Sequence, residues 1–100
     1  MRVISLKLLR EFWSRHPDAE SWLRQWYKAA AQAEWGNLQD VRRDYPHADG
    51  VATTAGDKLT VFNVCGNKYR LITRIRYDYR LVNVRAVLTH RAYSEGNWKD

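Results

Sequence analysis

Residues 67–77 alternate between two kinds of side chain, and this alternation limits the possible folds more than any other feature of the chain. Successive side chains of a β-strand point to opposite faces. A period of two therefore predicts a strand with one face on a core and the other on solvent or a ligand. The first set is mainly apolar and the second mainly basic: Tyr69, Leu71, Thr73, Ile75 and Tyr77 against Lys68, Arg70, Ile72, Arg74 and Arg76.

Further strands are expected around this one. Residues 59–64 are rich in β-branched and aromatic side chains, and residues 65–66 break them from the strand that follows. After a turn at residues 78–80, the chain returns with a second alternating stretch over residues 81–88. We expect Val82, Val84, Ala86 and Leu88 on one side of this returning strand, and Asn83 and Arg85 on the other. Two short strands are also predicted, an opening one at residues 2–4 and an edge strand at residues 51–55.

The first third of the chain has helical periodicity instead. Apolar residues recur there at intervals of three and four positions in two stretches, which predicts two helices. Ser5 is the expected N-cap of the first helix, and Pro17 ends it. Asp18 is the expected N-cap of the second helix, and Gly36 is its expected stop.

These elements predict an α+β fold in which two N-terminal helices pack on a small, mainly antiparallel twisted sheet. A short helical turn capped by Asn37 is expected to join the helices to the later strands. The chain has 100 residues, of which 45% are hydrophobic, and this is enough for one core. We therefore expect residues 1–100 to form a single domain.

The composition also limits the location of the protein. Cys65 is the only cysteine, which excludes an intrachain disulfide framework and a multi-cysteine metal site. Apolar runs of a few residues are too short for a transmembrane helix, so we expect no membrane association. Residues 1–7 do not have the apolar stretch of a secretory signal. These features favour a cytoplasmic protein.

Positive charge is concentrated in the second part of the chain. Residues 1–57 contain eight Lys or Arg and eight Asp or Glu, whereas residues 58–100 contain nine against three. The whole excess of +6 therefore follows residue 57, which favours a polyanionic partner, either nucleic acid or an acidic protein. A solvated outer face is the alternative. Like charges on one sheet face repel and the planar arginine fork suits phosphate oxygens, so we favour single-stranded RNA.

The sequence offers few groups for catalysis, and we expect neither a metal nor a cofactor. His16 and His47 are scattered, no HxxxH motif or carboxylate cluster has metal-ligand spacing, and no Gly-x-Ser-x-Gly motif occurs. His90 and Tyr93 would share a face if residues 89–93 form a helical turn. That would put a group titrating near neutrality beside a phenol at the end of the basic strands. The alternative is a structural role for His90.

Several short motifs resemble the HigB family of toxins, which belongs to the RelE/ParE-like superfamily of toxin–antitoxin systems. They are Val61-Phe62-Asn63-Val64 with Gly66-Asn67, Tyr69-Arg70-Leu71, Val87-Leu88-Thr89-His90 with Tyr93, Val3-Ile4-Ser5, and Tyr45-Pro46 with Asp49. The resemblance runs over essentially the whole chain. It implies two helices packed on an antiparallel sheet and cleavage of mRNA on translating ribosomes. It also implies neutralisation by a HigA-type helix-turn-helix antitoxin, in a toxin–antitoxin complex that is a higher oligomer.

The resemblance also implies roles for individual residues. Metal-free RNA cleavage uses the ribose 2′-hydroxyl as nucleophile, and it needs a base, an acid and cations that stabilise the phosphorane. By position in the motifs, His90 is the acid or base, Tyr93 its partner or a stacking surface, and Arg70 the stabilising cation. Asn63 and Asn67 are expected to be structural and to hold the neighbouring turn. The residues expected to bind RNA or the ribosome are Lys58, Lys68, Arg74, Arg76 and Arg85.

Two other functions stay open. The superfamily includes gyrase-poisoning members that cut no RNA, and a non-catalytic RNA-binding module would keep the basic strand face. Family members often carry an acidic residue beside the last tyrosine, where this chain has Ala92 and Ser94. We therefore expect no carboxylate role at that position.

Overall fold

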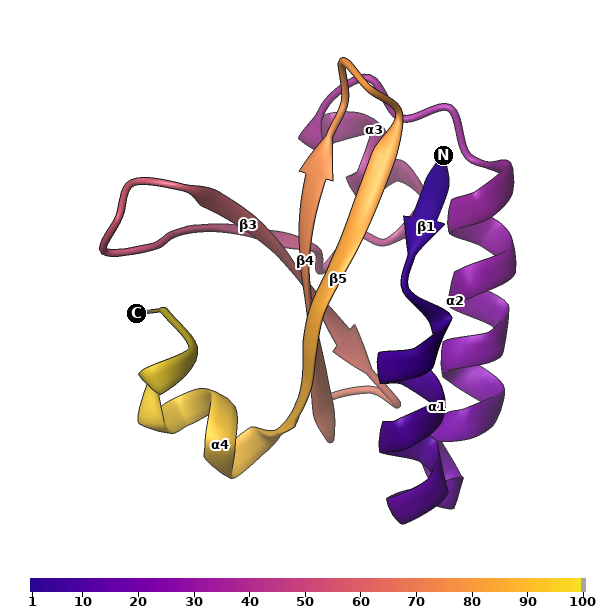
Figure 1. The fold of residues 1–100 in the computed structure, drawn as a ribbon, viewed down its shortest axis with the longest axis vertical. Helices are drawn as coiled ribbons and strands as arrows, with labels where there is room; N and C mark the ends of the chain where they lie inside the picture. Colours follow the sequence, from indigo (N-terminus) through magenta and orange to yellow (C-terminus); the bar gives the residue numbers. More distant parts are fainter. Residues whose placement is uncertain (100) are drawn as a thin grey trace.

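Residues 1–99 are described by a computed structural model, and within them five strands form one sheet (Figure 1). The order across the sheet is β1-β5-β4-β3-β2. β1 runs parallel to β5, and every other neighbouring pair is antiparallel, so the predicted α+β class with a mainly antiparallel sheet is confirmed. In chain order the elements are β1 (Arg2–Ile4), α1 (Leu6–Arg15), the 3₁₀ turn η1 (Pro17–Ala19), α2 (Glu20–Gln32), α3 (Leu38–Asp44), β2 (Asp49–Ala52), β3 (Lys58–Val64), β4 (Tyr69–Arg76), β5 (Leu81–Thr89), α4 (His90–Glu95) and the 3₁₀ turn η2 (Asn97–Lys99).

The helices α1 and α2 lie side by side over one face of the sheet, as predicted (Figure 1). Ser5 caps α1, because its Oγ accepts a hydrogen bond from the Lys7 N–H at 3.2 Å. The core between the two layers includes Leu23 and Trp26 of α2 and Phe62 of β3, each at most 1% exposed. Burying a side chain of this size stabilises the fold by ~1.5–3 kcal/mol relative to leaving it in water.

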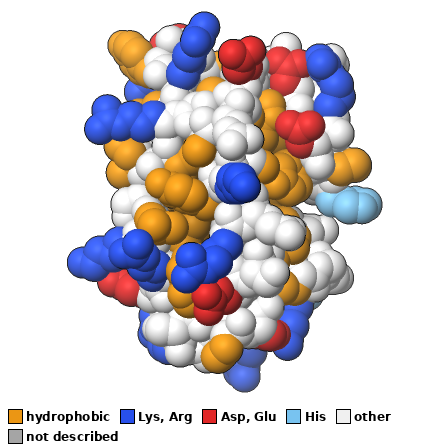
Figure 2. Space-filling model, turned by 90° about the vertical axis from the view of Figure 1, so that its right-hand side faces the viewer, with side chains coloured by type: hydrophobic (Ala, Val, Ile, Leu, Met, Phe, Trp, Pro, Cys, Tyr) orange, Lys and Arg blue, Asp and Glu red, His pale blue; other side chains and the backbone are white. Residues whose placement is uncertain are grey.

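The outer side of this helix layer has a mixed surface. Figure 2 shows Lys and Arg side chains and acidic side chains around patches of hydrophobic atoms. Leu8 of α1 is 36% exposed, an amount that is ordinary for a single apolar residue on a protein surface.

The opposite face of the sheet is partly covered by the C-terminal segment. α4 and η2 follow β5 and fold back over the sheet (Figure 1). Leu59, Val61 and Ile72 are buried there, and Tyr93 and Trp98 pack against them. These residues form a second small core. The sequence predicts instead that this face meets solvent or a ligand.

The predicted boundaries of α2 are wrong at both ends. Pro17 starts a 3₁₀ turn, which moves the N-cap from Asp18 to Ala19. The Asp18 carboxylate instead accepts hydrogen bonds from side chains of the β3–β4 connection and of β4. α2 ends at Gln32, well before Gly36, because the backbone of Ala33 is extended, with φ −73° and ψ 154°.

The segment between α2 and β3 is more regular than its composition indicates. Asn37 caps α3 as predicted, because its Oδ1 accepts a hydrogen bond from the Asp40 N–H at 3.0 Å. The predicted edge strand exists, but it covers Asp49–Ala52 rather than residues 51–55. Residues 53–57 form the turn to β3, in which the Thr53 N–H donates to the Asp57 carbonyl at 2.7 Å.

A β-bulge divides β5 into two halves that face opposite ways. Thr73 pairs with Val84 and Ile72 pairs with Ala86, so Arg85 is an extra residue on β5. Val82 and Val84 therefore join the core under the helices, whereas Ala86 and Leu88 pack on the other face. The prediction that all four share one face is wrong, since a bulge reverses the alternation.

Every helix within residues 1–99 is too short or too polar to span a bilayer.

Candidate active site

A cavity of about 550 Å³ opens where β3 and β4 meet α4 and the turn that precedes β2. It contains two of the three predicted catalytic residues, Arg70 and Tyr93. Its full lining is Arg42, Pro46, His47, Ala48, Asp49, Val61, Asn63, Arg70 and Tyr93. The cavity therefore combines two cations, an imidazole, a carboxylate, an amide and a phenol.

Arg70 is the most enclosed charged group of the cavity, with 8% of its surface exposed. Its Nη1 donates hydrogen bonds to the carbonyl oxygens of Asn67 at 3.1 Å and Tyr69 at 3.0 Å, and its Nη2 donates to Asn67 Oδ1. A guanidinium has five N–H groups, so these three bonds leave two for a ligand. Asn67 thus positions the arginine, whereas the sequence predicts that it holds the turn around Gly66.

No carboxylate within residues 1–99 forms an ion pair with Arg70. Enclosed charges in proteins are normally paired, because desolvation of an isolated charge is costly. An enclosed guanidinium with two free N–H groups and no ion-paired carboxylate suits an anion, and phosphate matches its planar fork.

Tyr93 lies on α4 and is held from two sides. The Arg70 guanidinium lies over its ring, 5.3 Å from the centroid. On the other side Trp98 stacks on it, with the ring centroids 4.9 Å apart, and the Trp98 indole N–H donates to the Tyr93 carbonyl at 2.8 Å. The predicted helical turn at residues 89–93 is confirmed, with Thr89 at its N-cap. The phenol of Tyr93 therefore has a fixed place beside the arginine.

The end of α3 and the turn before β2 supply cavity residues that the sequence analysis did not select. Arg42 donates from Nε to the Ala48 carbonyl at 2.9 Å, and its Nη2 lies 3.8 Å from Asp49 Oδ1. His47 lies between them in sequence and also lines the cavity. The available signal was Pro46 just before an edge strand, because such a turn puts its polar residues at the end of the neighbouring strand.

His90, the third predicted catalytic residue, is the first residue of α4 and is exposed. Its Nδ1 lies 3.4 Å from Ser94 Oγ. The ring is outside the lining of the cavity, although His90 is one helical turn from Tyr93. Side chains at i and i+3 of a helix are neighbours, so a rotation of the exposed imidazole can bring it toward a ligand at Tyr93.

The residues predicted to bind RNA differ in their exposure and in their ion pairs. Arg74 and Arg76 are half-exposed and lie 3.7 Å from Asp57 and from Asp78, respectively. Lys58 and Arg85 are exposed. Ion pairs at this distance on the surface are weak, so the two arginines can exchange their carboxylates for phosphates.

Lys68 is not part of the basic strand face, contrary to the prediction. It lies in the turn before β4, and its ammonium pairs with the Asp18 carboxylate near the start of α2. The Tyr69 hydroxyl donates to the same carboxylate at 2.9 Å. Hydrogen bonds from Lys68 and Tyr69 lower the pKa of Asp18, and the hydrogen bond to Asp18 raises the pKa of Lys68. This cluster ties the start of α2 to the β3–β4 turn.

Comparison with known proteins gives two findings. A family model described as HigB toxin, the RelE-like toxic component of a toxin–antitoxin system, matches residues 19–96. Three curated relatives, from Escherichia coli K12, Escherichia coli O157:H7 and Shigella flexneri, are each 25% identical over 93 residues. The match covers 93% of this chain and 88% of each relative. The K12 protein is named mRNA interferase toxin HigB, and the other two are named mRNA interferase HigB.

Proposed function

Because the chain belongs to the HigB family of RelE-like toxins of toxin–antitoxin systems, we propose that it is an mRNA endoribonuclease that cuts without a metal and thereby inhibits translation. The observation that carries this proposal is the enclosed Arg70, which keeps two N–H groups free in a cavity shared with Tyr93. The activity is the one for which the curated relatives are named. A toxin that acts on mRNA works in the cytoplasm.

The proposed reaction is attack by the ribose 2′-hydroxyl on the adjacent phosphate. The 2′-oxygen forms a bond to phosphorus, the bond to the 5′-oxygen of the next nucleotide breaks, and a cyclic phosphate is left on the 5′ fragment. Negative charge builds up on the non-bridging oxygens in the phosphorane. Arg70 would stabilise this charge through its two free N–H groups, and Arg42 would add a second cation at the mouth.

Proton transfer needs an acid or a base beside the phosphate. We assign this role to His90, one helical turn before Tyr93, where RNA at the Tyr93 hydroxyl would come within reach of the exposed imidazole. Catalytic hydrogen bonds often form only when the substrate is bound, and rotation of the exposed imidazole would bring it to the substrate. His47 is the rival, because it lines the cavity. Tyr93 would support a base or the reacting ribose.

The partners follow from the same proposal. We expect cleavage on translating ribosomes, with Lys58, Arg74, Arg76 and Arg85 in contact with RNA, whereas Lys68 is held by Asp18. The first four lie on β3, β4 or β5, where Lys58 and Arg85 are exposed and the other two are half-exposed. A HigA-type helix-turn-helix antitoxin would neutralise the toxin in a complex of higher order.

Expression in a bacterial host tests the function. We expect growth arrest and new mRNA 5′ ends with the wild type, and neither with Arg70→Ala. Arg10→Ala is the matched control, because Arg10 is exposed on α1 and lies outside the cavity. It should behave as the wild type. Growth arrest without new mRNA ends would contradict the endoribonuclease and favour a toxin that binds a protein target such as gyrase. RNA binding with neither effect would indicate a non-catalytic RNA-binding module.

A further inference from the structure

A second cavity, of about 190 Å³, adjoins the cavity of Arg70 around the edge of the sheet. Four residues line both cavities: Pro46, His47, Ala48 and Asn63. The second cavity lies on the helix side, where Trp22 of α2 and Phe62 of β3 form part of its wall. A strand of RNA whose phosphate sits at Arg70 therefore has a second hollow directly beside it.

The lining of this cavity is aromatic. Trp22 and Tyr45 are half-buried, and their ring centroids are 5.9 Å apart at an angle of 56°. The rings are thus tilted against each other rather than stacked. Phe62 lies behind Tyr45, with ring centroids 5.3 Å apart. Aromatic side chains at the end of a cationic groove are the usual surface for unstacked bases of single-stranded RNA.

The size of the cavity points to a single ring system. Pockets for drug-sized ligands begin at about 300 Å³, and this cavity has about 190 Å³. Liquid water takes ~30 Å³ per molecule, so the space is also far larger than one buried water needs.

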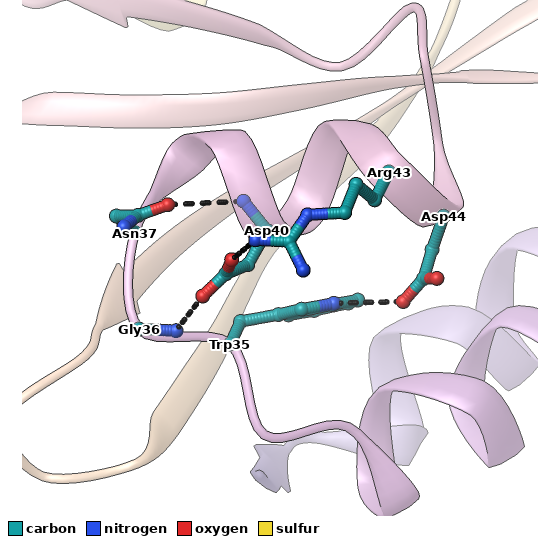
Figure 3. Close-up of polar contacts among 6 residues, drawn as sticks. All are labelled: Trp35, Gly36, Asn37, Asp40, Arg43 and Asp44. Atoms are coloured by element: carbon teal, nitrogen blue, oxygen red, sulfur yellow. Dashed lines mark hydrogen bonds and ion pairs between the residues drawn. The ribbon is translucent and has the colours of Figure 1, made fainter.

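Two polar groups at the cavity can read the edge of a base. Figure 3 shows that Asp44 accepts a hydrogen bond from the Trp35 indole through one oxygen, at 3.0 Å, and turns the other oxygen away from it. The carboxylate is therefore fixed in place with an acceptor to spare. Within residues 1–99, the side-chain amide of Asn63 has no hydrogen-bond partner. The sequence predicts instead that Asn63 holds the neighbouring turn. An amide offers both donors and an acceptor.

We propose that the cavity of Trp22 and Tyr45 binds one unstacked RNA base next to the phosphate held by Arg70, and so sets the base preference of cleavage. This inference rests on the proposed endoribonuclease function. Asp44 can only accept hydrogen bonds, so this position favours a base that turns a ring N–H or an amino group toward the carboxylate.

Mapping of mRNA 5′ ends in cells tests the inference during cleavage. The wild type should cut with a base preference at one fixed position relative to the cut. Trp22→Leu should flatten this preference and still cut. The matched control is Tyr27→Leu, which removes another half-buried aromatic ring of α2 outside both cavities and should keep the preference. An unchanged preference in Trp22→Leu would overturn the base pocket and leave the endoribonuclease standing.

A binding experiment separates the pocket from the activity. Short single-stranded RNA oligonucleotides, each with one abasic position, are titrated against the purified toxin. Loss of one particular base should weaken wild-type binding by about tenfold or more, which is the scale of a base stacked on an aromatic ring. Trp22→Leu should bind the intact and the abasic strand equally. Base-dependent binding by a wild type that cuts no mRNA would support the pocket and contradict the endoribonuclease. The same weakening at every abasic position would overturn the pocket. Melting temperatures of both variants identify any loss of folding.

Discussion

Arg70 and Tyr93 form the proposed functional unit of the molecule at the scale of single residues. The Arg70 guanidinium lies over the phenol ring and donates hydrogen bonds to the backbone and side-chain oxygens of Asn67. A cation fixed in this way needs little reorganisation when charge develops on a phosphate, which is the main advantage of an enclosed site over water. Both residues are selected from the sequence through the family resemblance, because each belongs to a motif that can be read locally.

His90 and His47 are the two candidates for proton transfer, and their substitution distinguishes them. His90→Gln should lower the cleavage rate by about 10²–10⁴-fold, the usual contribution of a proton-transfer group, and should remove one limb of the pH–rate profile. His47→Gln should have a smaller effect on the rate and keep both limbs. The measurement is the cleavage rate of ribosome-bound mRNA as a function of pH. The reverse pattern would assign proton transfer to His47, which the cavity also permits.

At the scale of elements, a residue inserted in a strand has large consequences. Arg85 is exposed and contacts no core, yet it determines which side chains of β5 face which layer. The alternation of residues 81–88 is regular in sequence, so nothing local reveals that the ladder slips by one position against β4. The sequence therefore predicts that β5 is a strand, but not which face of the sheet each of its side chains occupies.

Deletion of Arg85 tests this view of β5. Without the extra residue, either Ala86 and Leu88 or Val82 and Val84 must turn to the wrong face. Loss of two buried aliphatic side chains from a core costs several kcal/mol, at ~2–5 kcal/mol for a large one. We expect the deletion variant to be unfolded or strongly destabilised in denaturant titration. Arg85→Ala keeps the bulge and should unfold within ~0.5 kcal/mol of the wild type. Equal stability of both variants would contradict a structural role of the bulge.

The cluster of Asp18, Lys68 and Tyr69 connects elements that are 50 residues apart in sequence. The sequence predicts a helix cap for Asp18 and RNA binding for Lys68, because each is read within its own segment. Only the fold shows that the two side chains meet. Long-range pairing of polar side chains is therefore the second feature that the sequence does not reveal.

Acid titration tests this cluster. The pKa of Asp18 is lowered in the folded protein by its hydrogen bonds with Lys68 and Tyr69. A carboxyl whose folded pKa is below its ordinary value of 3.8 contributes stability above that pH and loses it as the pH falls. Asp18→Asn should therefore melt below the wild type at pH 5–7, and the difference should shrink as the pH falls through about 3.8 and below. Glu11→Gln, which removes an exposed i,i+4 pair of α1 at 3.9 Å, is the control and should change the melting temperature less. A difference independent of pH would mean that the ionised carboxylate is not what stabilises the fold.

At the scale of the whole molecule, the distribution of charge and the position of the cavity agree. The excess charge of +6 arises after residue 57, in the strands and helix that border Arg70 and Tyr93. Residues before 58 sum to zero, and the helix layer they build has a mixed surface (Figure 2). A field of one sign around a cationic cavity attracts a polyanion and raises the rate of encounter. Charge counting thus predicts the side of the molecule on which the cavity of Arg70 lies, although it does not predict that α3 supplies Arg42 or that the turn before β2 supplies His47.

The dependence of RNA binding on salt tests this arrangement. Each phosphate contact releases counterions, so the logarithm of the binding constant for a single strand falls against the logarithm of salt concentration by about 0.7 per contact. Arg74→Ala and Arg76→Ala should each make this slope shallower by about that amount, because both arginines can leave weak surface ion pairs for phosphates. Arg10→Ala removes the same charge from α1 and should leave the slope unchanged. If all three substitutions change the slope equally, RNA senses only the net charge of the protein and the strand face has no special role. If only Arg74→Ala and Arg76→Ala make the slope shallower, the sheet is the surface along which RNA lies on its way to the cavity.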